Sequence, residues 1–186
     1  MRNKNFQYDF IKGDEISIIF IINKEGRVFE VLIDTKNLDR VINFKYLWHA
    51  AWHDNDEYYI TTSTYEGHDD KGKSIHETIY LQRFILDGKI SPKDLVDHIN
   101  FNKLDNRESN LRITNSSNNL KNRTHLNKNN KSGHRNVSWI NNWYRIQLQI
   151  SGKNYLFSEK FKDITEAAKF AEEMRQEYYG EFSGTG

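Results

Sequence analysis

The chain of 186 residues has no cysteine and only one proline. Without cysteine it can form neither a disulfide framework nor a zinc site with thiolate ligands. No apolar stretch approaches the roughly 20 residues that a membrane-spanning helix needs. The first five residues lead into no apolar secretory region. These absences exclude a disulfide-stapled secreted domain, and we expect a cytoplasmic protein with no membrane partner.

The chain also lacks a strong overall charge, because 27 lysines and arginines oppose 26 acidic residues. The distribution of charge is uneven. Residues 1–96 hold 13 basic and 16 acidic residues, a net charge of −3, whereas residues 101–160 hold 11 and 3, a net charge of +8. A basic segment of this kind suits a surface that binds a polyanion. A solvated loop region with ordinary lysines has the same composition.

An Asp-His pair, Asp97-His98, opens the most informative stretch of the chain. Asn110 follows His98 after twelve residues, and Asn119 follows Asn110 after nine more. Leu104-Asp105-Asn106-Arg107 and Leu111-Arg112 lie between them. Over about 28 residues this arrangement resembles the HNH family of metal-dependent DNA endonucleases, in the phage- and intron-borne branch in which the last His is replaced by Asn.

These residue types suit the cleavage of a phosphodiester bond. Cleavage requires an attacking water, a base that takes its proton, and positive charge near the oxygens that become more negative. Asp97 offers a carboxylate oxygen and Asn119 an amide oxygen, and Mg²⁺ prefers oxygen ligands. If residues 96–99 are extended, the side chains alternate and His98 points away from Asp97. Its imidazole titrates near neutral pH, as a general base should.

The resemblance implies a role for each of these residues. Asp97 and Asn119 are expected to bind Mg²⁺, with Mn²⁺ as a substitute, and His98 to act as the general base. Asn110 is expected to tie down the loop that carries the Asp-His pair. Residues 116–123 are expected to form the helix that carries Asn119, with an N-cap at Thr114 or Asn115.

Each residue also has a structural interpretation. A lone His in an apolar strand is usually structural, and asparagines commonly form turns and caps. Asn118 competes with Asn119 for the role of ligand, although the family spacing favours Asn119. At a position where the family has His, this chain has Gln82, so no role is assigned there. The neighbouring Arg83 is retained and faces either a phosphate or a structural partner.

The residues before this motif are predicted to be mainly strands. Residues 16–22 are rich in β-branched and aromatic side chains, and residues 27–33 alternate as a second strand. With the turn at 23–26 between them they predict a hairpin. Tyr46, Trp48 and Trp52 are expected to pack a small core. The other predicted elements are one or two helical turns within 34–44, strands over 57–63 and 74–80, a polar hairpin tip at 66–73, and a short helix over 81–86.

Residues 134–183 carry a second resemblance. Strands are predicted over 134–139, 143–150 and 154–161, followed by a helix from 162 to about 180 that Asp163 or Thr165 caps. The segments "Ser-Gly-Lys" and "Ile-Thr-Glu-Ala-Ala" fall between and after these strands. Three strands and one helix with these markers resemble the plant ethylene-response-factor type of DNA-binding domain.

Alternation in the second of these strands predicts two different faces. Its apolar face is expected to pack on a helix stripe made of Ala167, Ala168, Phe170, Ala171, Met174 and Tyr178. Arg145, Gln147 and Gln149 share the opposite face and can read guanine and adenine edges, or they form an ordinary polar face. Arg135 and Trp139 are expected to join that surface, unless Trp139 packs in the core. The predicted DNA contacts are Arg83, Arg112, Asn122, Arg123, Lys128, Lys131, Arg135, Trp139, Arg145, Gln147, Gln149 and Lys153.

Together these patterns predict an α+β fold with four parts. They are a β-rich segment over 1–80, a ββα-metal nuclease core over 81–123, a basic linker over 124–133, and a three-stranded antiparallel sheet packed on one helix over 134–186. The predicted activity is that of a phage-encoded, homing-type endonuclease acting on double-stranded DNA. A monomer is expected to nick and a homodimer to cut both strands. The alternatives are a DNA-binding regulator with an inactive core, an exclusion or restriction-like nuclease, and an RNA-directed nuclease.

Overall fold

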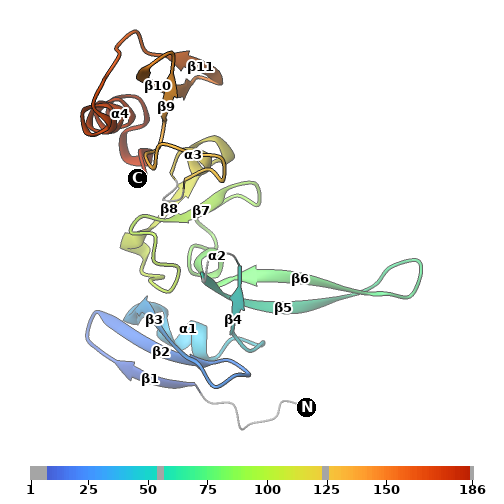
Figure 1. Cartoon of the computed structure of the whole chain (residues 1–186). Coiled ribbons are helices and arrows are strands. Elements are labelled where there is room, and N and C mark those ends of the chain that lie inside the picture. Colours follow the sequence, from blue (N-terminus) through green and yellow to red (C-terminus); the bar gives the residue numbers. More distant parts are fainter. Residues whose placement is uncertain (1–7, 54–56, 123–125, 185–186) are drawn as a thin grey trace. The chain divides into compact units, whose positions relative to one another are not determined.

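The structure, a computed structural model, describes residues 8–53, 57–122 and 126–184. The chain forms two compact units, Met1–Thr114 and Asn115–Gly186 (Figure 1). In its described part the fold is mixed α+β, with four small sheets and few helices. The predicted α+β class is therefore confirmed. No helix among the described residues combines the length and apolar character needed to cross a membrane.

The first unit begins with an antiparallel sheet in the order β1-β2-β3, formed by Asp9–Lys12, Ile16–Ile22 and Val28–Asp34. The predicted hairpin over residues 16–33 is confirmed, with Ile19 opposite Val31 and Ile22 opposite Val28. Its turn closes by a hydrogen bond from the Gly26 amide to the Asn23 carbonyl (3.0 Å). A 3₁₀ helix, η1 (Thr35–Asn37), and a short helix, α1 (Leu38–Ile42), follow.

The second sheet has the order β4-β5-β6, formed by His49–Trp52, Tyr58–His68 and Ser74–Tyr80. Strand β5 runs past the predicted end at residue 63, so β5 and β6 extend beyond β4 as a long two-stranded ribbon (Figure 1). The Asp69 carboxylate stabilises the turn at its tip by accepting bonds from the Lys71 and Lys73 amides (2.9 and 2.8 Å). Helix α2 (Leu81–Ile85) follows β6 directly.

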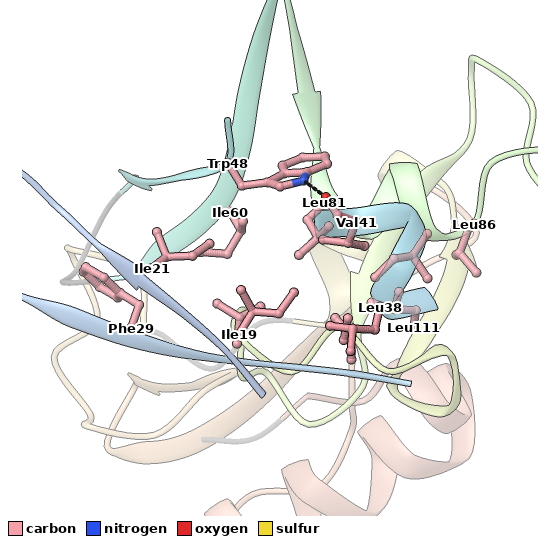
Figure 2. Close-up of a cluster of buried hydrophobic side chains, with 13 residues drawn as sticks. Ile19, Ile21, Phe29, Leu38, Val41, Trp48, Ile60, Leu81, Leu86 and Leu111 are labelled. Carbon is pink, nitrogen blue, oxygen red and sulfur yellow. Dashed lines mark hydrogen bonds between the residues drawn. The ribbon is translucent and has the colours of Figure 1, made fainter. Parts of the chain in front are cut away.

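A buried hydrophobic cluster joins these elements (Figure 2). Trp48 is 4% exposed, and its indole N–H donates to the Val41 carbonyl at 3.1 Å. Tyr46 is partly buried and contacts the Phe44 ring. The prediction for Trp52 is wrong, because this side chain is 62% exposed at the end of β4. The cluster comprises Ile19, Ile21, Phe29, Val31, Ile33, Leu38, Val41, Trp48, Ile60, Leu81, Ile85, Leu86 and Leu111.

A third, two-stranded sheet pairs β7 (Leu95–His98) with β8 (Leu111–Thr114), and a 3₁₀ helix, η2 (Glu108–Asn110), precedes β8. The loop between the two strands joins the free edge of β3. The Leu32 amide donates to the Leu104 carbonyl (2.9 Å), and the Asn106 amide donates to the Leu32 carbonyl (2.8 Å). The N-terminal sheet therefore braces the loop that follows the Asp-His pair.

The second unit contains α3 (Ser116–Lys121), an antiparallel sheet in the order β11-β10-β9, and α4 (Ile164–Tyr179), which ends in the 3₁₀ helix η3 (Gly180–Phe182). The strands are β9 (Val137–Ile140), β10 (Trp143–Ile150) and β11 (Lys153–Leu156). Strand β10 has its predicted bounds. Strand β11 is shorter than predicted, because after Phe157 the chain leaves the sheet and returns only at Phe161, which bridges Tyr144.

Helix α4 packs on β10 by the face that carries Ala167 and Ala171. The Asp163 side chain caps the helix by accepting bonds from the Thr165 and Glu166 amides (2.7 and 3.0 Å). The helix ends at Gly180, whose positive φ of 55° suits glycine. Tyr178 of the predicted stripe is 44% exposed, although its ring contacts that of the buried Phe157 (centroids 6.0 Å apart), and its neighbour Tyr179 is buried.

Candidate functional site

Asp97 and His98 are the last two residues of β7, and they lie on opposite faces of the β7–β8 hairpin. Asp97 is directly opposite Arg112, whereas His98 is opposite Leu111. This follows from the alternation of side chains along a strand. Both side chains are buried, with 6% and 1% of their surface exposed. Neighbouring residues therefore hold their carboxylate and imidazole in two different environments.

The imidazole of His98 is hydrogen-bonded at one nitrogen. Its Nε2 lies 3.3 Å from the Asn106 side-chain oxygen, which can only accept. That contact assigns the ring proton to Nε2 and leaves a lone pair on Nδ1. Among the residues that the structure describes, the buried Nδ1 has no hydrogen-bond partner. A neutral His with an unengaged Nδ1 lone pair can accept a proton from a bound water.

Burial, together with the positive charge of Lys103, lowers the pKa of His98 to about 4. The imidazole is therefore neutral at pH 7. Tyr59 of β5 lies beside it, with ring centroids 6.2 Å apart. Burial raises the pKa of Tyr59 to about 12, so this phenol stays protonated. The Lys103 ammonium lies 5.7 Å from the centroid of the Tyr59 ring.

Asn110 anchors the loop that follows His98. Its side-chain oxygen accepts a bond from the Asn100 amide (2.9 Å), and its side-chain nitrogen donates to the Asp105 carbonyl (2.7 Å). The Asn110 carbonyl also accepts a bond from the Ile99 amide (2.8 Å). The buried side-chain amide of Asn110 thus holds the loop together through Asn100 and Asp105. The structure does not test a catalytic role for Asn110.

Sequence reasoning assigned no role to three polar residues of this loop. Asp105 and Asn106 are 1% and 0% exposed. The Asp105 carboxylate accepts from Asn100 (2.8 Å) and from two nitrogens of Arg107 (2.7 and 2.6 Å). The Arg107 guanidinium lowers the pKa of that carboxyl. In the sequence, the polar run Asp105-Asn106-Arg107 between two strands could have indicated these residues. Polar side chains that become buried need hydrogen-bond partners, and neighbours in such a run can supply them.

The Asp97 carboxylate forms a buried ion pair with Arg112. Two guanidinium nitrogens of Arg112 donate to Oδ2 of Asp97, at 3.1 and 2.9 Å. Arg112 was predicted to contact DNA, but its side chain is only 10% exposed and lies on Asp97. A role for Arg112 at DNA stays a prediction; the structure shows it orienting the carboxylate.

Asn119, the other predicted metal ligand, is exposed on α3 in the second unit, whereas Asp97 belongs to the first. Asn115, one of the two expected N-caps of α3, accepts a bond from the Asn118 amide (2.9 Å). The competitor Asn118 is partly buried, and its side chain accepts from Lys121 (3.5 Å). Among the described residues no three His, Asp or Glu side chains form a group that could hold a metal ion. The predicted site, with one carboxylate and one amide ligand, does not need such a group of three.

The predicted DNA contacts fall into two groups. The buried or partly buried group bonds to protein carbonyls: Arg83 to Asp94, Ser91 and Pro92, Arg135 to Ser183 and Lys121, and Arg145 to Phe157. Asn122 is also buried, at the end of α3. The exposed group is Lys128, Lys131, Trp139, Gln147, Gln149 and Lys153. Arg123 lies outside the described residues.

Trp139 does not share a face with Arg145. It lies directly opposite Tyr144, with ring centroids 4.6 Å apart, whereas Ser138 is the residue opposite Arg145. Its side chain is nevertheless 54% exposed, because it lies beyond the core that Ile146 and Leu148 form. The predicted surface of Arg135, Trp139 and Arg145 is therefore not assembled in the structure. Gln147 and Gln149 are exposed as expected.

Comparison with curated proteins gives one informative similarity. The chain is 34% identical over 131 residues to an uncharacterized HNH endonuclease of Acanthamoeba polyphaga mimivirus, a match that covers 68% of this chain and 65% of the relative. The chain thus spans just under two thirds of the length of that relative. The similarity supports an HNH nuclease family. No family model matches the chain, and no solved structure matches it.

Proposed function

We propose that the chain is a metal-dependent, site-specific DNA endonuclease of the HNH type. The observation that carries the proposal is the state of His98: a buried imidazole with its proton assigned to Nε2 and an Nδ1 that has no hydrogen-bond partner among the described residues. A general base needs that arrangement, because the lone pair must be free when the attacking water arrives. The similarity to a relative named as an HNH endonuclease agrees with it.

His98 acts as the base that takes a proton from water as the phosphodiester is attacked. Asn106 holds the ring in one tautomer and one orientation. Asn110 keeps the loop that carries Asn106 closed on β7, because its side chain bonds to Asn100 and Asp105. Positioning through such a chain of bonds is a recognised requirement of acid–base catalysis.

The two proposed ligands carry the oxygen donors that a hard divalent cation prefers. Asp97 would supply a carboxylate oxygen and Asn119 an amide oxygen to Mg²⁺, an ion that binds few protein oxygens and completes its shell with water and phosphate. When bound, Mg²⁺ or Mn²⁺ supplies positive charge for the phosphate oxygens. Arg112 orients the Asp97 carboxylate through two hydrogen bonds. The chain's own contribution is thus an oriented carboxylate on one face of the β7–β8 hairpin and a fixed base on the other.

The proposed substrate is double-stranded DNA, and the proposed product of a monomer is a nick. One base and one cation serve one strand at a time, so a double-strand break requires a homodimer or two successive events. The exposed lysines of the second unit, Lys128, Lys131 and Lys153, are proposed to bind the backbone. The proposed homing role rests on the resemblance to the phage- and intron-borne branch of the HNH family.

Cleavage of supercoiled plasmid in Mg²⁺, Mn²⁺ or EDTA tests this function. We expect nicking in either metal, none in EDTA, and loss of nicking in His98→Ala. The matched control is His76→Ala, because His76 is exposed on β6. If His98→Ala cleaves like the wild type, the base is wrongly assigned. If no variant or wild-type protein cuts any DNA but all bind it, the chain is a DNA-binding regulator.

A further inference from the structure

The loop between β7 and β8 carries a lysine, Lys103, to which sequence reasoning assigned no role. Its ammonium and the His98 ring lie beside the same aromatic side chain. The Tyr59 centroid is 5.7 Å from the ammonium and 6.2 Å from the His98 centroid, so the ammonium and the imidazole are at most about 12 Å apart. The positive charge of Lys103 also contributes to the lowered pKa of His98. The field of this lysine therefore reaches the proposed base.

The backbone of Lys103 is linked to His98 through a single side chain. Asn106 Oδ1 lies 3.3 Å from Nε2 of His98, and Nδ2 of the same amide donates to the Lys103 carbonyl (3.2 Å). Asn106 is 0% exposed. The Asn102 side chain accepts a bond from the Leu104 amide (3.1 Å), which stabilises the turn that contains Lys103. The imidazole and the backbone that carries the lysine are therefore held at a fixed spacing.

The basic side chains of the β7–β8 hairpin differ in their partners. Two nitrogens of Arg107 donate to the Asp105 carboxylate (2.7 and 2.6 Å), and Arg112 pairs with Asp97 (2.9 Å). Among the described residues the Lys103 ammonium forms no hydrogen bond or ion pair, and its side chain is partly exposed. Its charge is therefore available to an anionic ligand.

Lys103 also lines a hollow of about 180 Å³. Arg27 lines the same hollow, with its guanidinium 5.0 and 4.9 Å from the centroids of the Phe29 and Tyr58 rings. Glu57 is the one acidic side chain among the described residues of the lining. Two cations against one carboxylate suit the approach of a phosphate backbone.

The position of the lysine matters because Asp97 and His98 lie on opposite faces of the hairpin. When water attacks a phosphodiester, negative charge grows on the non-bridging oxygens of the phosphate. A donor that is already in place beside the base stabilises this charge without reorganisation as it develops. Lys103 supplies such a donor on the side of the hairpin where His98 lies.

We propose that Lys103 is a catalytic residue that donates a hydrogen bond to a non-bridging oxygen of the scissile phosphate of DNA. This role rests on the proposed endonuclease function. Water forms the new P–O bond and gives its proton to His98, while one bridging P–O bond breaks and the leaving sugar oxygen takes a proton from solvent. The ammonium transfers no proton in this step, and its contact strengthens as the phosphate becomes more negative.

Nicking of supercoiled plasmid in Mg²⁺ under single-turnover conditions tests the role. Lys103→Met removes the charge and keeps the length of the side chain, and we expect it to lower the rate about 100-fold, the low end for loss of one transition-state donor. Lys103→Arg keeps a cation and should retain at least about a tenth of the wild-type rate. Lys71→Met makes the same change at an exposed lysine of the first unit and should leave the rate unchanged. Thermal unfolding of each variant checks that the fold is kept.

A binding measurement in EDTA locates the contact. The probe is a fluorescent DNA duplex centred on the mapped nick, either unmodified or with an uncharged methylphosphonate in place of the scissile phosphate. In the wild type this replacement removes the charge that Lys103 binds and should weaken binding. In Lys103→Met the same replacement should cost at least about threefold less affinity, because both changes remove one interaction.

The outcomes separate the role of Lys103 from the proposed function. If the wild type nicks the plasmid and Lys103→Met nicks it at the same rate, Lys103 is not catalytic, although the endonuclease function stands. If Lys103→Met is slow but the methylphosphonate lowers the affinity of both proteins equally, the lysine does not touch the scissile phosphate and the proposal is wrong. If the wild type nicks no DNA, the proposed function fails and the role of Lys103 fails with it.

Discussion

The tautomer and orientation of the His98 ring depend on the side chain of Asn106. In Asn106→Ala, Nε2 loses its acceptor and the ring loses its fixed orientation. We expect kcat to fall about 10- to 100-fold, as for other residues that orient a functional His, with KM for DNA unchanged. Asn106→Asp keeps an acceptor at the same place and should recover part of the loss. A change confined to KM would contradict the positioning role.

Glu108 gives a pH-dependent contribution to stability. Hydrogen bonds from Lys89 (2.6 Å), Asn37 (3.0 Å) and Lys36 (3.0 Å) lower its pKa to about 2. A lowered folded-state pKa means stabilisation that is complete above the unfolded value of about 4.3 and is lost as the pH falls toward 2.

Glu108→Gln should therefore lower the free energy of unfolding at pH 7 by about 1 kcal/mol, since both lysines are largely exposed and screened by solvent. The difference between variant and wild type should shrink as the pH approaches 2. Urea denaturation at pH 7, 4 and 2.5 measures it, with Glu173→Gln on the exposed face of α4 as the control. A constant difference across this range would exclude the titration of Glu108 as its cause.

At the residue scale, the sequence could not predict which arginines are buried against protein groups. Arg112 and Arg135 suited a DNA surface by residue type, yet Arg112 pairs with Asp97 and Arg135 donates to the carbonyl of Ser183. The partner of Arg135 is 48 residues away in the sequence, so no local pattern could reveal it. A buried guanidinium and an exposed one look identical in a sequence.

At the scale of elements, strands with clear alternation or strong β propensity were predictable. Residues 16–22, 74–80 and 143–150 form strands with the predicted bounds. In residues 16–22 and 143–150 alternate side chains are buried, so the pattern shows which face meets the core. Elements set by tertiary contacts were less predictable: β5 is lengthened by pairing with β6, and residues 134–136 are kept out of β9 by the turn that Asn130 and Ser132 stabilise.

The loop between β7 and β8 is the element on which the candidate site depends. Asn110→Ala removes two bonds of a buried amide, to the Asn100 amide and the Asp105 carbonyl. We expect a loss of about 2 kcal/mol in the free energy of unfolding, from the unpaired groups left behind. Amide exchange at Asn100 should accelerate more than exchange in β2. Uniform acceleration across the first unit would show that the loop and the sheet open together.

At the scale of the whole molecule, the sequence predicted a nuclease core over residues 81–123, whereas the compact units divide between Thr114 and Asn115. The strands of the predicted core thus belong to the first unit and its helix α3 to the second. The ββα-metal arrangement therefore stays a prediction. Periodicity could not locate this division, because compactness depends on long-range contacts, such as those of Leu32 with the β7–β8 loop.

The whole chain's affinity for duplex DNA should depend on salt less steeply than its composition suggests. Residues 101–160 contain 11 basic side chains, but four arginines donate to protein acceptors: Arg107, Arg112, Arg135 and Arg145. Seven basic residues are then candidates for phosphate contacts, Arg123 among them. Each contact contributes about −0.9 to the slope of log K against log salt concentration, so we expect a slope no steeper than about −6. Anisotropy titrations with duplex at several KCl concentrations measure this slope. A value near −10 would mean that the four arginines leave their protein acceptors to bind DNA.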